Sequence, residues 1–226
     1  MTSSSGAGDS RAESGQQPQW SGVEIRKGPF SWGMLQDGWV YLLVDCSGSM
    51  AGDKMEQAKK GAAGFAKDAI AKGYSAGLIE FYGIANHLCE PTKDVTVLQP
   101  YIDGLEAKKA SKAQAFLAAF RRGVYGTNVS EAIRIAQDRL NELKGLKAIV
   151  LVTDGQANGP GDPDASLKRG ESAKKDGIDI ITIGTDDADQ DFLKKLASRT
   201  ELGMKVARDQ LQQAIVSSAN LLPGGN

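Results

Sequence analysis

Oxygen-bearing side chains at alternate positions follow the first long apolar run of the sequence. The run covers 39–44, and Asp45, Ser47 and Ser49 come directly after it. One carboxylate and two hydroxyls offer only oxygen donors, which suit Mg²⁺ or Mn²⁺ better than Zn²⁺. Asp, Ser and Gly are also common turn residues, so the same segment could be an ordinary turn between a strand and a helix. Ligands from other parts of the chain are needed to favour a metal.

Two later segments supply such ligands. Thr127 stands between Gly126 and Asn128, just before a segment with helical periodicity, and Asp154 follows the apolar run 148–153. In open α/β sheets, ligands bind beyond the carboxyl ends of the strands, where loops from different strands meet. We therefore predict a metal site at one edge of the sheet. Its ligands are Asp45, Ser47, Ser49, Thr127 and Asp154.

The elements that position these residues are predicted from short apolar runs that alternate with helical segments. This alternation favours a parallel sheet covered by helices on both faces. The expected strands are 39–44, 76–82, 148–153, 178–183 and 204–207, with 84–88 as a hairpin partner at a sheet edge. The expected helices cover 55–69, 129–143, 167–175, 189–196 and 209–222, and 97–105 is expected to be a short amphipathic turn or helix.

Four details of these helices are also predicted. Asp53 and Asn128 are expected to cap the helices that follow them, and Asp209 is expected to cap the last helix. Gly61 and Gly64 weaken the first helix by about 1 kcal/mol each relative to Ala. That cost is tolerable if the two glycines let the helix lie close to the sheet.

The motifs DCSGS, GTN and VTDG, in that order, resemble the von Willebrand factor type A family, and the resemblance covers 39–222. In that family the DxSxS, Thr and Asp residues form the metal ion-dependent adhesion site. The resemblance implies a Rossmann-like three-layer α/β/α fold, with a mostly parallel central sheet and one antiparallel edge strand. It also implies Mg²⁺ at the top of the sheet, with Mn²⁺ or Ca²⁺ as alternatives, completed by a carboxylate from a partner protein.

The chemistry of the five residues agrees with that implication. Two aspartates would neutralise a divalent cation, while three hydroxyls add neutral donors and leave the ion electrophilic. A small ion that keeps water at its remaining positions can exchange one water for an Asp or Glu of a partner. Family members without signal peptides often serve as intracellular adaptors, so we expect a non-enzymatic, metal-dependent protein-binding module. In some relatives the metal loop is coupled to displacement of the last helix, here 209–222.

Composition bounds the remaining possibilities. The chain of 226 residues has a formal net charge of -1, which gives no bias toward nucleic acid or an anionic membrane. We expect a disordered tail at 1–19, an N-terminal segment at 20–38 packed on the domain, and the domain itself at 39–222. The N-terminus has no secretory signal pattern, so a cytoplasmic location is the default expectation. The oligomeric state stays open.

The alternative function is a Mg²⁺-dependent phosphohydrolase or phosphotransferase, because such enzymes also place Asp at a strand end. That chemistry usually needs a nucleophilic carboxylate beside an acid or base, and a cation on the phosphate. Ser47 stands where a second carboxylate would be expected, and no motif fixes a lysine. His87 is the single histidine, and a structural role is expected for it. Cys46 is expected to be a small side chain under the loop and not a redox group.

A basic stretch lies between the expected hairpin and Thr127. It could be an ordinary solvated helix face, or it could help the metal to attract an acidic partner. The second interpretation makes these residues a candidate partner-binding surface: Lys108, Lys109, Lys112, Arg121 and Arg122.

Overall fold

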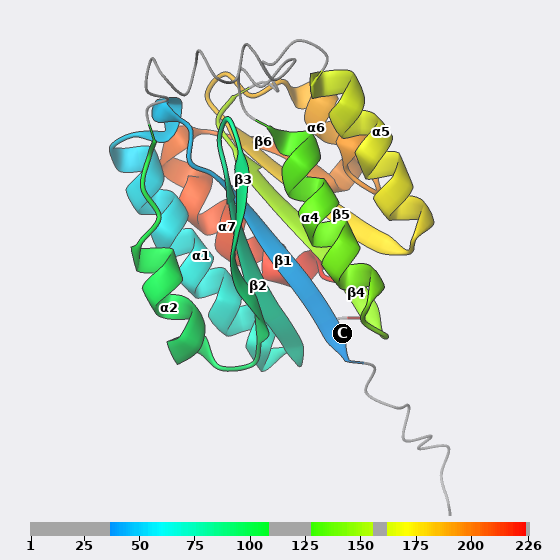
Figure 1. The fold of residues 1–226 in the computed structure, drawn as a ribbon. Helices are drawn as coiled ribbons and strands as arrows, with labels where there is room; N and C mark the ends of the chain where they lie inside the picture. Colours follow the sequence, from blue (N-terminus) through cyan, green and yellow to red (C-terminus); the bar gives the residue numbers. More distant parts are fainter. Residues whose placement is uncertain (1–36, 109–127, 156–161, 225–226) are drawn as a thin grey trace, which may run out of the picture. The chain divides into compact units, whose positions relative to one another are not determined.

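The computed structural model describes residues 37–108, 128–155 and 162–224. Within them, six strands form one sheet in the order β3-β2-β1-β4-β5-β6 (Figure 1). Neighbouring strands are parallel except β2 and β3, which pair antiparallel at one edge. The prediction of a mostly parallel sheet with one antiparallel edge strand is confirmed. The strands are β1 Gly38–Asp45, β2 Tyr74–Phe81, β3 Ala85–Thr92, β4 Leu146–Thr153, β5 Ile178–Thr185 and β6 Gly203–Val206.

Helices cover both faces of the sheet, as the alternation of apolar runs predicts. On one face α1, α2 and α7 pack on Val40, Leu42 and Val44 of β1. On the other face α4, α5 and α6 pack on Tyr41 and Leu43 of the same strand. Figure 1 shows the resulting three layers. The helices are α1 Asp53–Ala71, α2 Val95–Asp103, α4 Val129–Asn141, α5 Asp162–Lys175, α6 Gln190–Leu196 and α7 Leu211–Ser218.

The central strands read as continuous apolar runs because both of their faces are covered. Every residue of β2 is buried, and all of β1 except Trp39 is buried. The edge strand β3 differs, since only Cys89 is buried in it. This contrast explains why the core strands are easy to recognise from sequence, whereas the edge strand extends four residues beyond its predicted end at position 88.

The helix caps are predicted correctly in one of three cases. The side chain of Asn128 accepts the backbone N–H of Glu131 at 3.1 Å and caps α4, as predicted. Asp53 is not the cap of α1, because Gly52 precedes the helix with a φ of 81° and Asp53 is its first residue. Asp209 does not cap α7 either, because it lies inside a 3₁₀ turn, Arg208–Gln210, that leads into the helix.

The two glycines of α1 face another helix and not the sheet. A Cβ atom at Gly61 would lie 2.8 Å from the Cβ atom of Ile215, and one at Gly64 would lie 2.6 Å from a methyl carbon of Val216. Both of these neighbours belong to α7. The prediction that the glycines bring α1 close to the sheet is therefore wrong. They allow α1 and α7 to pack closely side by side on the same face.

His87 takes part in a polar cluster that links the edge strand to the rest of the fold. The hydroxyl of Tyr41 lies 3.0 Å from Nε2 of His87 and donates a hydrogen bond of 2.7 Å to Glu90. Arg139 of α4 forms an ion pair with the same Glu90. Burial, together with the charge of Arg139, lowers the pKa of His87. These contacts agree with the structural role expected for this histidine.

Several predictions fall on other parts of the chain. The tail at 1–19 and nearly all of the segment 20–38 lie outside the described residues, although Gly38 already belongs to β1. The stretch 109–127, which includes Thr127, also lies outside them. Among the described residues, no helix combines the length and the apolar character needed to cross a bilayer.

Candidate metal centre

The candidate ligands lie where the strand order reverses direction. From β1 the chain crosses through α1 to β2 on one side, and from β4 it crosses through α5 to β5 on the other side. The crevice between β1 and β4 is therefore the topological switch point, where open α/β sheets bind ligands. Asp45 is the last residue of β1, and Asp154 follows the last residue of β4. The two aspartates thus meet at the same edge, as predicted.

A continuous chain of hydrogen bonds joins four of the predicted ligands. The backbone N–H of Ser47 donates to Oδ1 of Asp45 at 2.8 Å. The hydroxyl oxygens of Ser47 and Ser49 are 2.9 Å apart, and Ser49 donates to Oδ1 of Asp154 at 2.8 Å. Thr153 donates to Oδ2 of Asp45 at 2.6 Å. The side chains therefore converge from two strands onto one point.

These oxygens have the spacing that a small divalent cation needs. Bonds of about 2.0–2.1 Å, as in Mg²⁺ sites, place adjacent ligands of an octahedron about 2.9–3.0 Å apart. The separations of 2.9 Å between Ser47 and Ser49 and of 2.8 Å between Ser49 and Asp154 match adjacent corners. The described residues hold no group of three or more His, Cys, Asp or Glu that could bind a metal, at this edge or elsewhere, and here hydroxyls stand beside two carboxylates. The residues fit a hard cation held mainly by hydroxyls.

The loop that carries Ser47 and Ser49 is attached to the core of the domain. Cys46 and Met50, which flank the two serines, are completely buried, whereas Ser47 and Ser49 are not. The backbone N–H of Cys46 donates to the carbonyl of Phe81 at 2.7 Å, which ties the loop to the end of β2. Burial, helped by the charges of Glu80 and Asp45, raises the pKa of the Cys46 thiol to about 12. These facts support the role predicted for Cys46 as a small packing residue.

Asp45 is the most perturbed acid of the site. Its side chain is fully buried, and burial raises its pKa from 3.8 to about 6 despite the hydrogen bonds from Thr153 and Ser47. The nearby charge of Asp154 acts in the same direction. A buried acid beside a second carboxylate is what a site prepared for a cation requires.

Lys54 is a member of the site that the sequence did not reveal. Its ammonium group pairs with Oδ2 of Asp154 and lies 3.0 Å from Oδ2 of Asp186, which follows β5. Arg208 donates to the same Asp186 at 2.7 Å. Although burial opposes it, the hydrogen bonds with Asp154 and Asp186 raise the pKa of Lys54. The only sequence signal was a lysine in the first turn of a helix, which is too common to predict this contact.

The profile of the von Willebrand factor type A domain matches residues 40–216. The chain belongs to this family. Domains of this type typically mediate metal-dependent protein interactions. The family resemblance carried by DCSGS, GTN and VTDG is thereby confirmed.

Solved structures share the fold of this von Willebrand factor type A domain. The vWF domain of the type V pili tip protein Mfa5 from Porphyromonas gingivalis gives a TM-score of 0.67 at 13% identity, covering 82% of this chain and 95% of that one. BatB from Bacteroides thetaiotaomicron gives 0.62 at 18% identity, covering 81% and 97%. Proximal thread matrix protein 1 from the mussel byssus, with a zinc-occupied MIDAS motif, gives 0.64 at 16% identity, covering 82% and 46%.

One curated relative is similar in sequence. The magnesium-chelatase 67 kDa subunit of Heliobacterium mobile is 28% identical over 138 residues, which are 61% of this chain and 19% of that protein. The chain thus spans about a fifth of the length of this relative. The similarity therefore concerns one part of the relative only.

Of the predicted partner-binding residues in the von Willebrand factor type A domain, only Lys108 is described. Its ammonium group pairs with Glu80, whose side chain is 5% exposed, and lies 5.1 Å from the ring centre of Tyr82. The charge of Lys108 is thus already partly neutralised within the domain. Lys109, Lys112, Arg121 and Arg122 lie outside the described residues.

The residues on both sides of the stretch 109–127 are bonded at the metal edge, which is the edge of the sheet formed by the carboxyl ends of the strands, where Asp45 and Asp154 lie. The N–H of Lys108 donates to the carbonyl of Cys46 at 2.7 Å, directly behind the serine loop. The N–H of Asn128 donates to the carbonyl of Tyr82 at 2.7 Å, just beyond the end of β2. The predicted ligand Thr127 is thus the immediate neighbour of a residue fixed at this edge.

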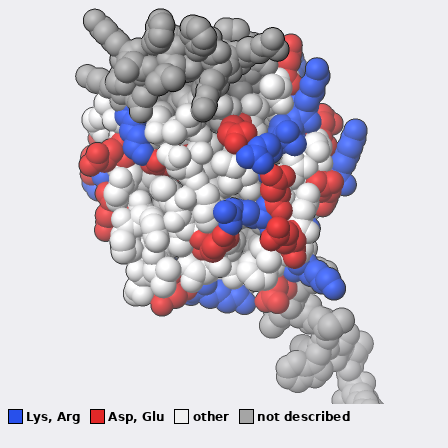
Figure 2. All heavy atoms as spheres, in the orientation of Figure 1, with Lys and Arg blue, Asp and Glu red and all other residues white. Residues whose placement is uncertain are grey.

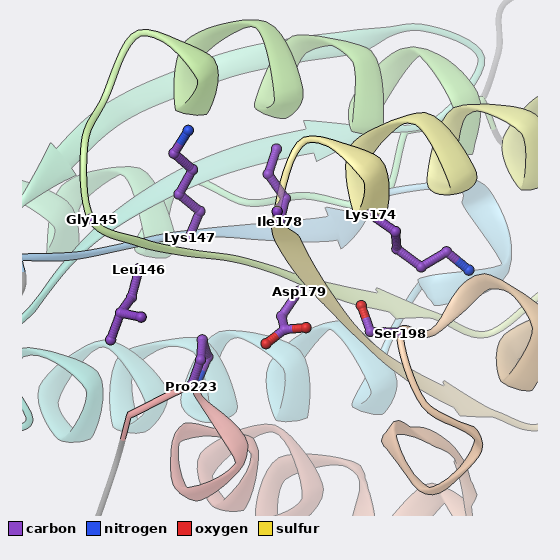
Figure 3. Close-up of a pocket in the computed structure, with 9 residues that line it drawn as sticks. Gly145, Leu146, Lys147, Lys174, Ile178, Asp179, Ser198 and Pro223 are labelled. Carbon is purple, nitrogen blue, oxygen red and sulfur yellow. The ribbon is translucent and has the colours of Figure 1, made fainter.

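A shallow cavity of about 370 Å³ lies at the opposite edge of the sheet, near the first residues of β4 and β5 (Figure 3). Lys147, Lys174 and Asp179 supply its charged groups. The ammonium of Lys174 already pairs with Glu171 at 2.8 Å, and in Figure 3 it points away from Asp179. Figure 2 shows acidic and basic side chains interspersed on the face in view. Neither the cavity nor the charged surface shows a ligand geometry like that of the metal edge.

Proposed function

We propose that this von Willebrand factor type A domain is a metal-dependent protein-interaction module that binds an Asp or Glu side chain of a partner protein. The observation that carries the proposal is the row of oxygens from Ser47 through Ser49 to Asp154, spaced 2.9 and 2.8 Å apart. The row spans two strand ends at the switch point of the sheet. It fits adjacent positions of an octahedral Mg²⁺ site, with Mn²⁺ or Ca²⁺ as alternatives.

Each residue has a distinct task on this proposal. Asp45 and Asp154 supply the negative charge that balances a divalent cation, while Ser47 and Ser49 supply neutral oxygens. Thr153 orients the buried carboxylate of Asp45 through its hydrogen bond of 2.6 Å. Thr127 is the fifth proposed ligand. These residues would hold the ion, and the ion would supply an electrophilic position for a carboxylate oxygen of the partner.

The geometry favours binding over catalysis. Within the described residues, the hydroxyls of Ser47 and Ser49 bond to each other and to Asp154, and no histidine contacts them. The thiol of Cys46 is buried and its pKa is raised to about 12, so it is a poor nucleophile at neutral pH. Of the proteins with a similar structure, one is named as a pili tip protein and another as a thread matrix protein. These points support a non-enzymatic role.

The proposal includes an intracellular adaptor role in the cytoplasm. Both cysteines of the chain, Cys46 and Cys89, are free and buried, which is compatible with a reducing compartment. The formal net charge of -1 gives no reason to propose nucleic acid or a membrane surface as the partner. Fractionation of the native host tests the location directly, because recovery in a secreted fraction would contradict it.

Affinity capture from the native host tests the proposed function. The chain is immobilised as wild type, as the double variant Ser47→Ala/Ser49→Ala, and as Ser217→Ala, which removes a hydroxyl from α7 away from the site. Each is used with Mg²⁺ and with a chelator. We expect the same partners on wild type and Ser217→Ala with Mg²⁺ only. Partners that survive both the chelator and the double variant would contradict the adhesion-site mechanism.

A further inference from the structure

Lys54 places a cation of the protein's own at the candidate metal site. Its ammonium group sits between Asp154 and Asp186, which follow the neighbouring strands β4 and β5. The side chains of Lys54 and Asp154 are only 11% and 1% exposed. The pair is therefore poorly screened by water, and its charges act strongly on anything that binds beside them.

The two oxygens of Asp154 serve different partners. Oδ1 accepts the hydroxyl of Ser49, and thus belongs to the row of oxygens that fits a divalent ion. Oδ2 holds the ammonium of Lys54. An ion on the Oδ1 side would lie within a few ångströms of the ammonium and draw on the same carboxylate charge. The lysine and the metal therefore compete for Asp154.

Asp186 gives the lysine a second partner. Its Oδ2 lies 3.0 Å from the ammonium, and the carboxylate is held in place by Arg208 at 2.7 Å. The backbone of Asp186 has a φ of 49°, in the left-handed region that Asp tolerates better than most residues. When the carboxylate of Asp154 binds a metal, Lys54 can keep its ion pair with Asp186. A lysine with a single carboxylate partner would not have this option.

We propose that Lys54 is a tethered competitor that weakens divalent-metal binding at the adhesion site and is released toward Asp186 when the metal binds. The inference rests on the proposed function, and it adds a determinant of metal affinity within the chain itself. Half-occupancy of the site would then need a higher metal concentration, while the metal-free protein keeps Asp154 neutralised. Lys54 acts as a positioning residue for Asp154 and not as a ligand.

Calorimetric titration with Mn²⁺ and with Mg²⁺ tests this proposal. Lys54→Met removes the charge and keeps much of the side-chain length. We expect it to bind each metal about tenfold more tightly than wild type, which corresponds to about 1.4 kcal/mol. Lys54→Arg, which keeps the charge, and Lys59→Met, which removes a different lysine of α1, should stay within about twofold of wild type, well below that tenfold change. Equal or weaker binding by a folded Lys54→Met protein would overturn the proposal.

A second variant changes the affinity in the opposite direction. Asp186→Asn removes the alternative partner of Lys54, so the ammonium stays on Asp154 and metal binding should weaken several-fold. This variant keeps the proposal testable if Lys54→Met does not fold, since circular dichroism identifies a folded Asp186→Asn protein. Unchanged or tighter metal binding by Asp186→Asn would also overturn the proposal.

Different results would contradict the competitor role of Lys54 and the metal site itself. If wild type binds Mn²⁺ and Lys54→Met binds it no more tightly, the competitor role is wrong and the adhesion site stands. If neither protein binds Mn²⁺ or Mg²⁺, the proposed function fails together with this inference. Binding by Lys54→Met where wild type shows none would support both.

Discussion

Replacing Asp45 by Asn should stabilise the metal-free protein at neutral pH while removing its response to metal. Asp45 is fully buried, and its pKa is raised from 3.8 to about 6. Keeping this carboxylate ionised therefore lowers the free energy of unfolding. The amide keeps the shape of the side chain, and its oxygen can still accept the N–H of Ser47 that Asp45 accepts at 2.8 Å.

The size of the effect follows from linkage. A rise of about two pKa units at about 1.4 kcal/mol each gives a ceiling of about 3 kcal/mol. Because the folded pKa lies above the unfolded value, the cost is absent well below pH 4, grows between about pH 4 and 6, and is complete above pH 6. We expect Asp45→Asn to raise the free energy of unfolding by about 1–3 kcal/mol at pH 7.5, with most of the gain lost at pH 4.

Urea unfolding in the presence of a chelator measures the gain in the free energy of unfolding at pH 7.5 and its loss at pH 4. Asp164→Asn, at an exposed position of α5, is the matched control and should show no comparable gain. Saturating Mg²⁺ should then stabilise wild type but not Asp45→Asn, since a ligand stabilises only the protein that binds it. A gain of the same size at both pH values, or a variant less stable than wild type at pH 7.5, would refute the reasoning.

Three further substitutions test contacts made by residues other than the proposed ligands, each by urea unfolding against wild type. Tyr41→Phe removes the hydroxyl that donates to Glu90 at 2.7 Å and should cost about 1–2 kcal/mol, and no loss would show that the cluster does not stabilise the fold. Lys108→Met leaves the buried carboxylate of Glu80 without its cation and should cost about 2–3 kcal/mol, a loss that Glu80→Gln in the same chain should largely reverse. Gly64→Val places atoms where a Cβ is already 2.6 Å from a side chain of α7, so a loss of about 1–3 kcal/mol is expected, and full stability would mean that the two helices can separate freely.

The sequence predicted the core of the site because it depends on one rule of sheet geometry. Parallel strands end at the same edge, so Asp45 and Asp154 had to meet once both preceding runs were recognised as strands. Ser47 and Ser49 followed from the alternate spacing after Asp45. Hydrogen bonds bring four of the five residues together, and their role as metal ligands stays a prediction.

The features that were missed depend on how helices lie against one another and against the strand ends. Lys54 reaches Asp154 only because α1 begins beside the end of β4, one hundred positions away in sequence. Gly61 and Gly64 face α7 because two helices share one face of the sheet, and helical periodicity cannot tell a neighbouring helix from the sheet. The cap of α1 was misplaced because Gly52, with its φ of 81°, ends the preceding turn one residue before Asp53.

The anchors at Lys108 and Asn128 make the metal edge a natural graft point. Lys108 is bonded to Cys46, Cys46 to Phe81, and the next residue, Tyr82, to Asn128, so Lys108 and Asn128 are both fixed at the ends of two adjacent strands. In general, the entropic cost of joining two fixed points by a flexible segment grows only by about 0.6 kcal/mol for each doubling of the segment's length. A different recognition sequence could therefore be exchanged at 109–126, with the proposed ligand Thr127 kept, while the sheet that positions Asp45 and Asp154 stays intact.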